Sequence, residues 1–421
     1  MRPVLVLIFH ATAPADAGPL VRALAEARHA LAERQRAAFI AAGADEADVV
    51  AGPPDGLSFG ERLQAELRAR AGAGPRAGAM PGAVTEPRAG AERAAEPRAG
   101  AERAAEPRAG AESRAGAESR AGAQPAVGGV IVMGSGSIPL ATAADLRRFV
   151  EVAAGPAGHA IANNRYSADV VAVSRAAGLA ELPPLPADNA LPRWLEERAG
   201  VAVTDLRGRW RLGVDIDTPL DLILLRDPAA GGLRAASPLF REWPIDDRLT
   251  AISDVLSNRR AELLVAGRVS AATLTWLQRG VACRVRALVE ERGLRAASRL
   301  ALAGGPEGGN TRPPRSVLGE LLDTRDGPDA LARTVARLAD AAIIDTRVLL
   351  AHRNGSDESS WPSAEDRFRS DLLLPEFIVD PWLAAVTRSA ADSPAPILLG
   401  GHTMVNGGLR LLAQRARVGA R

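Results

Sequence analysis

Residues 213–225 read GVDIDTPLDLILL, and this stretch decides how the N-terminal half of the chain is interpreted. The alternation before Asp217 predicts a strand that ends with two carboxylates, Asp215 and Asp217, on one face. Thr218 and Pro219 then start a helix with Asp221 in its first turn. Paired carboxylates at the end of a sheet strand can hold Mg²⁺, whereas Thr218 and Asp221 by themselves are also typical of a helix cap.

The segments upstream of this stretch alternate between apolar strands and helices. Apolar runs predict strands, and apolar residues at helical spacing predict the helices between them. Strands with continuous apolar sequence are buried on both faces, so we expect an α/β domain whose mostly parallel sheet carries helices on both sides. The predicted strands are 3–9, 47–52, 128–136 and 168–174, and the predicted helices are 19–42, 58–71 and 142–153, the last capped by Thr142.

A repetitive segment interrupts this domain. Residues 86–123 repeat EPRAGAERAA and then ESRAGA, without a large apolar residue. Such a composition cannot bury a core, because alanine is its only apolar side chain. We therefore predict a disordered low-complexity insert over 81–125, which divides the first domain into 1–80 and 126–228.

The C-terminal half has its own apolar segments. A Gly/Pro-rich linker is predicted over 229–248, and a second, smaller α/β domain of unknown function over 249–421. Its buried strands are expected within 261–267, 341–352 and 395–402. Asp345, Arg347, His352 and His402 lie near the ends of these segments. They could form a metal or acid–base site, or they could be satisfied structurally.

Composition limits the class of protein. The 421 residues contain 52 basic residues, all of them arginine, and 50 acidic residues, so the net charge of +2 gives no reason to expect a nucleic-acid partner. The apolar fraction of 47% is typical of a chain that folds around a core. No apolar run is long enough to cross a membrane, and the single Cys283 suits a reducing compartment, so we expect a cytoplasmic protein without a membrane partner.

Three segments of the first domain resemble one known family. DIDTPLDL (215–222) resembles the DxDTPxDL motif of the 2-phospholactate and molybdenum-cofactor guanylyltransferases. SFGERL (58–63) and, beyond the insert, VIVMGSGSIPL (130–140) resemble the helix, strand and turn of the same family. The resemblance covers 1–80 and 126–228, and it implies a nucleotidyltransferase-like, or GT-A, fold.

The resemblance also implies the residues of a site. Asp215 and Asp217 would hold Mg²⁺, and the turn after 130–133 would hold the phosphates of a nucleotide through Gly134, Ser135, Gly136 and Ser137. The segment ANNRYSADVV (162–171) occupies the region where the family recognises its acceptor. The candidate acceptor-binding residues there are Asn163, Asn164, Arg165, Ser167 and Asp169, of which Arg165 would suit a phosphate or carboxylate. Alternatively, the segment is a polar turn in which Asn and Asp bond their own backbone.

Two departures from the family leave two functions open. The metal-binding Asp of the family's turn is replaced by Gly136, and the family's opening glycine-rich loop with Arg and Lys is absent. The first hypothesis is a nucleotidyl- or glycosyl-transferase that binds a nucleotide with Mg²⁺ and a small phosphorylated or carboxylated acceptor. The alternative is a catalytically inactive nucleotide- or metabolite-binding protein that keeps the fold. The transferase hypothesis requires the three segments to meet at one edge of the sheet; if they did not meet, the binding protein would be the better account.

Overall fold

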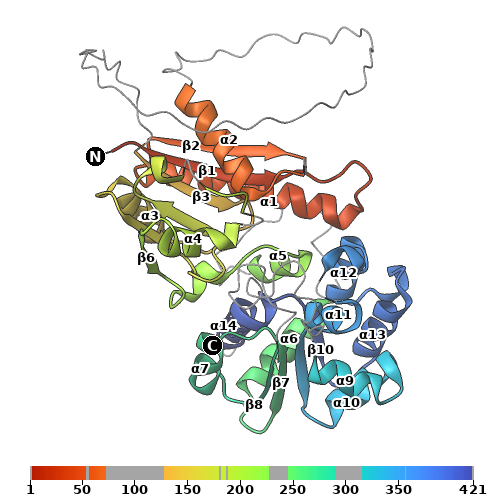
Figure 1. Cartoon of the computed structure of the whole chain (residues 1–421). Helices are drawn as coiled ribbons and strands as arrows, with labels where there is room; N and C mark the ends of the chain where they lie inside the picture. The colour runs from red at the N-terminus through yellow and green to blue at the C-terminus, as the bar shows by residue number, and fades with distance from the viewer. Residues whose placement is uncertain are drawn as a thin grey trace, which may run out of the picture.

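The computed structural model describes residues 2–53, 56–72, 128–179, 182–185, 188–226, 245–290, 315–355 and 357–419. The predicted insert over 81–125 lies outside the described residues, and so does the predicted linker up to Pro244. Figure 1 shows two α/β regions, each with its own sheet and helices, and α5 between them.

The first sheet has six strands in the order β2-β1-β3-β5-β4-β6. It is mixed, because β5 runs antiparallel to both of its neighbours, while the other five strands run in one direction. The reason is the short segment 163–169 between β4 and β5, since a parallel crossover needs a dozen or more residues. The strands are β1 (Val4–Ala11), β2 (Glu46–Gly52), β3 (Gly129–Gly134), β4 (His159–Ala162), β5 (Val170–Val173) and β6 (Ala202–Asp205).

Helices cover both faces of this sheet, as predicted. Ile8 packs in one cluster with Phe39 and Phe149, whereas its neighbour Leu7 packs with Leu63 on the other side. This follows from the strand period of two, which sends adjacent side chains to opposite faces. The covering helices are α1 (Pro19–Ala41) and α3 (Ala143–Ala154) on one face, and α2 (Phe59–Gly72) and α4 (Leu191–Glu197) on the other.

The strand predicted before Asp217 is wrong. A 3₁₀ turn, η3 (Trp210–Gly213), precedes it, and Asp215 forms only an isolated bridge with Ser137. Apolar and acidic residues alternate over 214–217 because Val214 and Ile216 are fully buried in the cluster that contains the second sheet. The helix start is confirmed: Thr218 caps α5 (Pro219–Leu225) in a capping box with Asp221.

The second sheet has four parallel strands in the order β10-β9-β7-β8. The three predicted strands are present, but the one expected over 341–352 ends at Asp345, whose side chain caps the helix that follows. Asp345 Oδ1 accepts a hydrogen bond from Arg347 N at 3.2 Å. The strands are β7 (Glu262–Gly267), β8 (Arg284–Val289), β9 (Ala341–Asp345) and β10 (Ile397–Gly400).

Helices surround this sheet and provide its crossovers. In Figure 1 they enclose β7 and β10 in the lower region. The helices are α6 (Ile245–Ser257), α7 (Ala271–Gly280), α9 (Val317–Asp323), α10 (Leu331–Ala336), α11 (Thr346–Asn354), α12 (Ala364–Asp371), α13 (Pro381–Ala391) and α14 (Leu409–Gly419).

One hydrophobic cluster joins the two halves. Leu24 of α1 and Leu220 of α5 belong to the same buried cluster as Leu264 of β7 and Ile343 of β9. The helix α5, which the sequence assigned to the first domain, therefore packs against the second sheet. The strands of the first sheet lie in two further clusters of their own, so helices of the first half, and not its sheet, form the apolar contact with the second half.

A carboxylate of the second half also caps the first helix. Glu365 of α12 accepts hydrogen bonds from Leu20 N at 3.1 Å and from Val21 N at 3.2 Å. The N-cap residue Gly18 has no side chain to do this, and a Cβ there would lie 2.3 Å from the Glu365 carboxyl group. The contact satisfies two amides that a helix leaves unpaired at its N-terminus.

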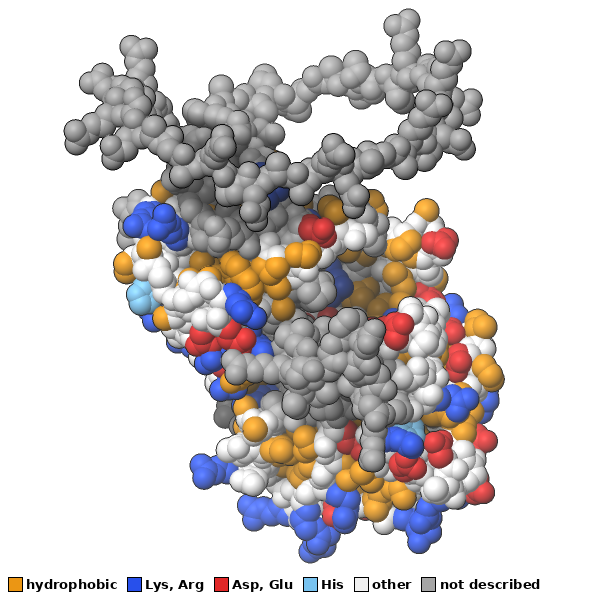
Figure 2. Space-filling model, in the orientation of Figure 1, with side chains coloured by type: hydrophobic (Ala, Val, Ile, Leu, Met, Phe, Trp, Pro, Cys, Tyr) orange, Lys and Arg blue, Asp and Glu red, His pale blue; other side chains and the backbone are white. Residues whose placement is uncertain are grey.

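The surface charge of the second half is mixed. Figure 2 shows arginine and acidic side chains interspersed over this face.

Within the described ranges, no helix combines the length and the hydrophobicity that a membrane span requires.

We predict that Glu365→Ala lowers the free energy of unfolding by about 1 kcal/mol, because α1 loses its only side-chain cap. Urea denaturation of the full chain measures this change. Glu376→Ala is the control, since Glu376 is exposed in the same half. Equal midpoints for the two variants would show that the contact does not stabilise α1.

Candidate functional site

Each sheet has a position where a crevice for ligands is expected. Open α/β sheets bind ligands beyond the carboxyl ends of their strands, where successive connections leave in opposite directions. In the first sheet this position lies between β1 and β3, and His10 Nδ1 and Ser135 Oγ lie there 3.0 Å apart in a hydrogen bond. In the second sheet it lies between β7 and β9, next to Arg268 and Asp345.

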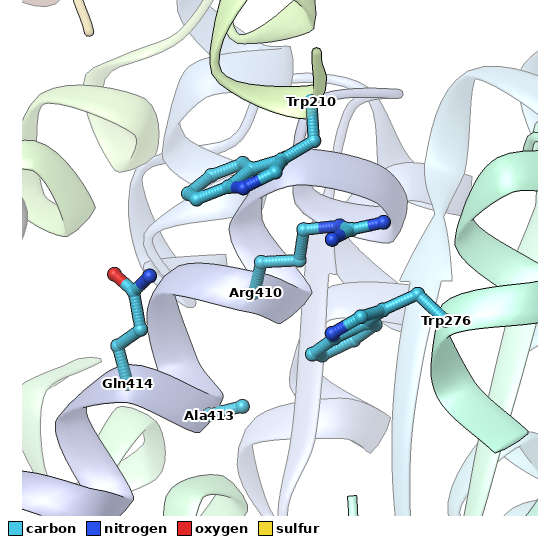
Figure 3. Close-up of a pocket in the computed structure, with 5 residues that line it drawn as sticks. All are labelled: Trp210, Trp276, Arg410, Ala413 and Gln414. Carbon is cyan, nitrogen blue, oxygen red and sulfur yellow. The ribbon is translucent and has the colours of Figure 1, made fainter. Parts of the chain in front are cut away.

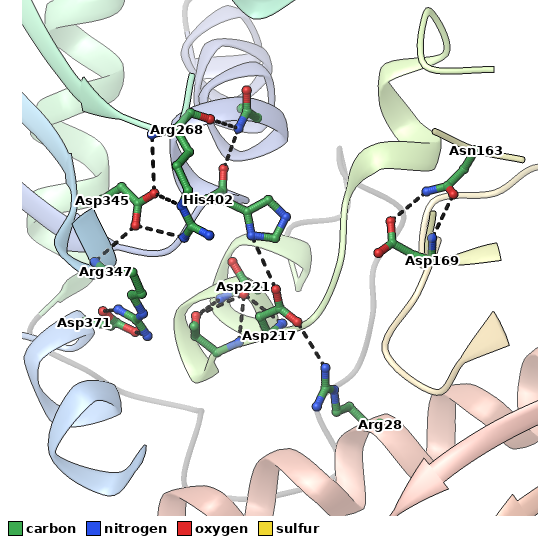
Figure 4. A network of polar contacts seen from close by, with 12 residues as sticks. Arg28, Asn163, Asp169, Asp217, Asp221, Arg268, Asp345, Arg347, Asp371 and His402 are labelled. Atoms are coloured by element: carbon green, nitrogen blue, oxygen red, sulfur yellow. Dashed lines mark hydrogen bonds and ion pairs between the residues drawn. The ribbon is translucent and has the colours of Figure 1, made fainter. Parts of the chain in front are cut away.

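Asp217 lies between these two positions. Arg28 Nη2 of α1 donates to Asp217 Oδ1 at 3.1 Å, and His402 Nδ1, just after β10, lies 3.5 Å from Asp217 Oδ2. Figure 4 shows Asp217 with Arg28 on one side and His402, Arg268 and Asp345 on the other. The side chains of Arg28, Asp217 and His402 are 35%, 42% and 37% exposed, so solvent reaches all three.

Asp215, Asp217 and His402 form a cluster that could hold a metal ion. Within the described residues, one ligand atom from each lies within 4.8 Å of the other two. Two adjacent ligands at ~2.1 Å from a tetrahedral ion are about 3.4 Å apart. The 3.5 Å between His402 Nδ1 and Asp217 Oδ2 therefore suits two ligands of one cation. The sequence paired Asp215 with Asp217 but did not connect His402 to them.

The charge state of Asp217 is set by its basic neighbours. Burial alone would raise the pKa of Asp217, but His402 and Arg28, and more weakly Arg268 and Arg347, hold that pKa below its usual value. Asp217 is therefore ionised at neutral pH. An ionised carboxylate is the form that a cation or a guanidinium binds.

Asp221 stabilises the turn that contains Asp217. Burial, followed by the charge of Asp217, raises the pKa of Asp221 to about 7. Its Oδ2 accepts from Asp217 N at 3.0 Å, from Thr218 N at 2.8 Å and from Thr218 Oγ1 at 3.0 Å. These bonds fix the turn that presents Asp217, so Asp221 positions the site.

Two further arginines near Asp217 are each paired with a buried carboxylate. Arg268 binds Asp345 through two bonds, Nε to Oδ2 at 2.6 Å and Nη2 to Oδ1 at 3.0 Å. Arg347 binds Asp371 through both terminal nitrogens, with Nη2 at 2.7 Å from Oδ2. The carboxylates of Asp345 and Asp371 are completely buried. Asp345 and Arg347, considered as site residues from the sequence, are therefore held in structural ion pairs.

The turn Gly134–Ser137 packs against the protein itself. Ser135 binds His10, and the backbone oxygen of Ser137 accepts from Gln35 Nε2 at 2.6 Å. Both serines are only 6% exposed. A Cβ at Gly136 would lie 2.6 Å from Arg28 Nε and 2.8 Å from Ile216 O, so no side chain fits at this position. The packing of Arg28 and Ile216 thus accounts for a glycine at residue 136.

Burial, then His29 and Arg28, lower the pKa of His10. His10 is therefore neutral at pH 7, which matches its hydrogen bond to the Ser135 hydroxyl.

The proposed acceptor segment contains one structural residue and several accessible ones. Asn163 is 1% exposed, and its Nδ2 donates to Asp169 Oδ2 at 2.7 Å and to Leu212 O at 2.8 Å. Its Oδ1 accepts from Asp169 N and Val170 N. Asn163 therefore fixes the loop and has no group left for a ligand.

Its neighbours differ, because Asn164, Arg165, Ser167 and Asp169 are all partly exposed. Asn164 Oδ1 accepts from Tyr166 N at 3.0 Å, and Arg165 forms an ion pair with Glu196.

The three segments that the sequence expected to converge do lie side by side. Gly134 N donates to Asp169 O at 3.3 Å, Ser137 bridges to Asp215, and Asn163 binds Leu212 O. Their side chains nevertheless have separate partners, and Figure 4 shows the Asn163–Asp169 pair on loops apart from Asp217. Sequence reasoning thus placed the segments together but did not foresee the contacts of Asp217.

A second feature at the junction is a small, open hollow lined by Trp210, Trp276, Arg410, Ala413 and Gln414. Figure 3 shows the Arg410 guanidinium between the two indole rings, at 5.5 Å from Trp210 and 4.8 Å from Trp276. Trp210 belongs to the first half and the other two to the second. The stack therefore joins the halves and is explained as a cation–π contact.

Comparison of the chain with protein-family profiles, with curated proteins and with solved structures finds no match.

We predict that Asn163→Ala lowers the free energy of unfolding by about 3 kcal/mol, because it leaves buried amide and carbonyl groups without partners. Asn164→Ala is the matched control and should change it by about 0.5 kcal/mol or less. Chemical denaturation of both variants measures the difference. If both variants lost only a small and similar amount of unfolding free energy, Asn163 would again be a candidate ligand-binding residue.

Proposed function

We propose that this protein binds a divalent cation and a nucleotide at the junction of its two sheets and transfers a nucleotidyl or glycosyl group to a small acceptor. The observation that carries the proposal is the cluster of Asp215, Asp217 and His402, whose ligand atoms lie within 4.8 Å of one another. The cluster is next to the carboxyl ends of both sheets, where α/β proteins bind ligands.

The donor set indicates which cations fit. Two carboxylate oxygens suit Mg²⁺, the ion expected from the sequence. An imidazole nitrogen is a better ligand for Zn²⁺ and other first-row transition metals than for Mg²⁺. The proposal is therefore a divalent cation held by Asp215, Asp217 and His402, with Mg²⁺, Mn²⁺ and Zn²⁺ to be compared directly. When bound, it would neutralise negative charge on phosphate oxygens.

The proposed reaction needs few chemical groups from the chain. The acceptor oxygen forms the new bond as the bond to the phosphate-containing leaving group breaks, and the acceptor proton passes to solvent. The chain would contribute position and charge. Asn164, Arg165 and Ser167 are the accessible residues assigned to a phosphorylated or carboxylated acceptor, and Asn163 holds their loop.

A specific observation favours the second candidate, a catalytically inactive binding protein. Asp217 already has Arg28 and His402 as partners, and the Gly134–Ser137 turn is buried against His10 and Gln35. The chain itself therefore supplies partners for the Asp217 carboxylate and for the turn, as expected for a site that binds a ligand without performing chemistry.

We predict that Asp217→Asn abolishes the rise in melting temperature caused by the cation and leaves the fold intact, because the half-exposed carboxylate contributes little to packing. A ligand at 100-fold its Kd stabilises by about 2.7 kcal/mol, which a thermal melt detects. The control Asp254→Asn changes an exposed carboxylate of α6 and should respond like the wild type. A wild-type protein indifferent to all three cations would refute the metal site.

Activity separates the two candidates. Release of pyrophosphate from nucleoside triphosphates, and of the nucleotide from nucleotide sugars, is measured with the cation and pools of phosphorylated or carboxylated acceptors. Release that requires Asp217 supports the transferase. Nucleotide binding without release in any pool supports the binding protein.

A further inference from the structure

Arg28 is the basic residue of the junction with donors to spare. Its Nη2 donates to Asp217 Oδ1, and within the described residues this is its one hydrogen bond. Arg268 and Arg347, in contrast, are each bound through two nitrogens to a buried carboxylate. A guanidinium has five N–H donors. The terminal nitrogens of Arg28 therefore keep most of their donors for a ligand.

The Arg28 side chain packs against the turn that contains Gly136. Its Nε is buried next to Gly136, at 2.6 Å from the point where a Cβ would lie. The side chain as a whole is 35% exposed, so its terminal nitrogens are the part that solvent reaches. The absence of a side chain at residue 136 thus makes room for a guanidinium beside the candidate metal ligands.

The charge carried by the candidate metal ligands and Arg28 changes sign when a cation binds. With both aspartates ionised and His402 neutral, Asp215 and Asp217 contribute two negative charges and Arg28 one positive charge, so these four groups sum to −1. A divalent cation changes this sum to +1. An anion is repelled from the first state and attracted to the second. A cation would also compete with Arg28 for the Asp217 carboxylate.

We infer that Arg28 is the phosphate-binding residue of the junction and that cation binding releases it from Asp217 to an incoming phosphate group. The inference rests on the proposed function, because it requires the cation site of Asp215, Asp217 and His402. The ligand class is a tetrahedral oxyanion, such as a phosphate group of a nucleotide. Arg28 suits it because a guanidinium binds two phosphate oxygens at once.

This exchange makes the two ligands cooperative. A cation that releases Arg28 tightens phosphate binding, and by linkage phosphate tightens cation binding by the same factor. For the wild type we expect Mn²⁺ to tighten the binding of inorganic phosphate by about tenfold or more, within the usual range of such couplings.

The test is calorimetric titration of the full chain with Mn²⁺ alone, inorganic phosphate alone, and phosphate in the presence of Mn²⁺. Arg28→Gln should still bind Mn²⁺ but should lose the phosphate response. Arg28→Lys keeps the positive charge and should retain part of the phosphate response. Arg34→Gln, which changes an exposed arginine on the same helix, is the matched control and should behave as the wild type.

Asp217→Asn gives a second, independent readout. It should lose Mn²⁺ binding, yet it should bind phosphate without Mn²⁺ more tightly than the wild type does, because Arg28 is no longer neutralised. This result does not depend on whether Arg28→Gln folds.

The outcomes separate the two proposals. If the wild type binds Mn²⁺ through Asp217 but Arg28→Gln keeps the full phosphate response, the role of Arg28 is refuted and the metal site stands. Unchanged phosphate affinity of Asp217→Asn without Mn²⁺ would refute the exchange as well. If the wild type does not bind Mn²⁺, Mg²⁺ or Zn²⁺, the proposed function itself fails.

Discussion

The contact on which the arrangement of the site depends is the Asp217 carboxylate between Arg28 and His402. A carboxylate at the junction of two protein halves needs compensating charge, because removal from water without a partner is costly. Each half supplies one cationic or polar partner: Arg28 comes from the helix that follows β1, and His402 comes from the loop that follows β10. The site therefore exists only when both sheets are folded and in contact.

The rest of the junction supports this contact. The apolar residues of α1 and α5 lie in one cluster with β7 and β9, Glu365 caps α1, and Arg410 lies between Trp210 and Trp276. These contacts differ in kind, being hydrophobic burial, helix capping and cation–π attraction. Together they hold the carboxyl edges of two independent sheets at one place, which is the condition for residues of both sheets to bind a common ligand.

The glycine at residue 136 has a local structural role. Gly136 is in contact with Arg28 and Ile216 O, so a side chain at residue 136 would displace the guanidinium that pairs with Asp217. His402 supplies a third candidate ligand from the second half of the chain. The second half therefore completes the candidate metal site.

The sequence by itself determined the local elements. Continuous apolar runs specified β1, β3, β7 and β10, and the Thr–x–x–Asp patterns at Thr142 and Thr218 specified two helix starts, because strand burial and capping depend on neighbours along the chain. Only the tertiary structure decided that 214–216 is a buried connection rather than a strand, since its apolar residues face a core built by distant segments. The same holds for the meeting of Asp217 with His402 and Arg28. Their approach is set by how two sheets pack, and no periodicity in the sequence encodes that packing.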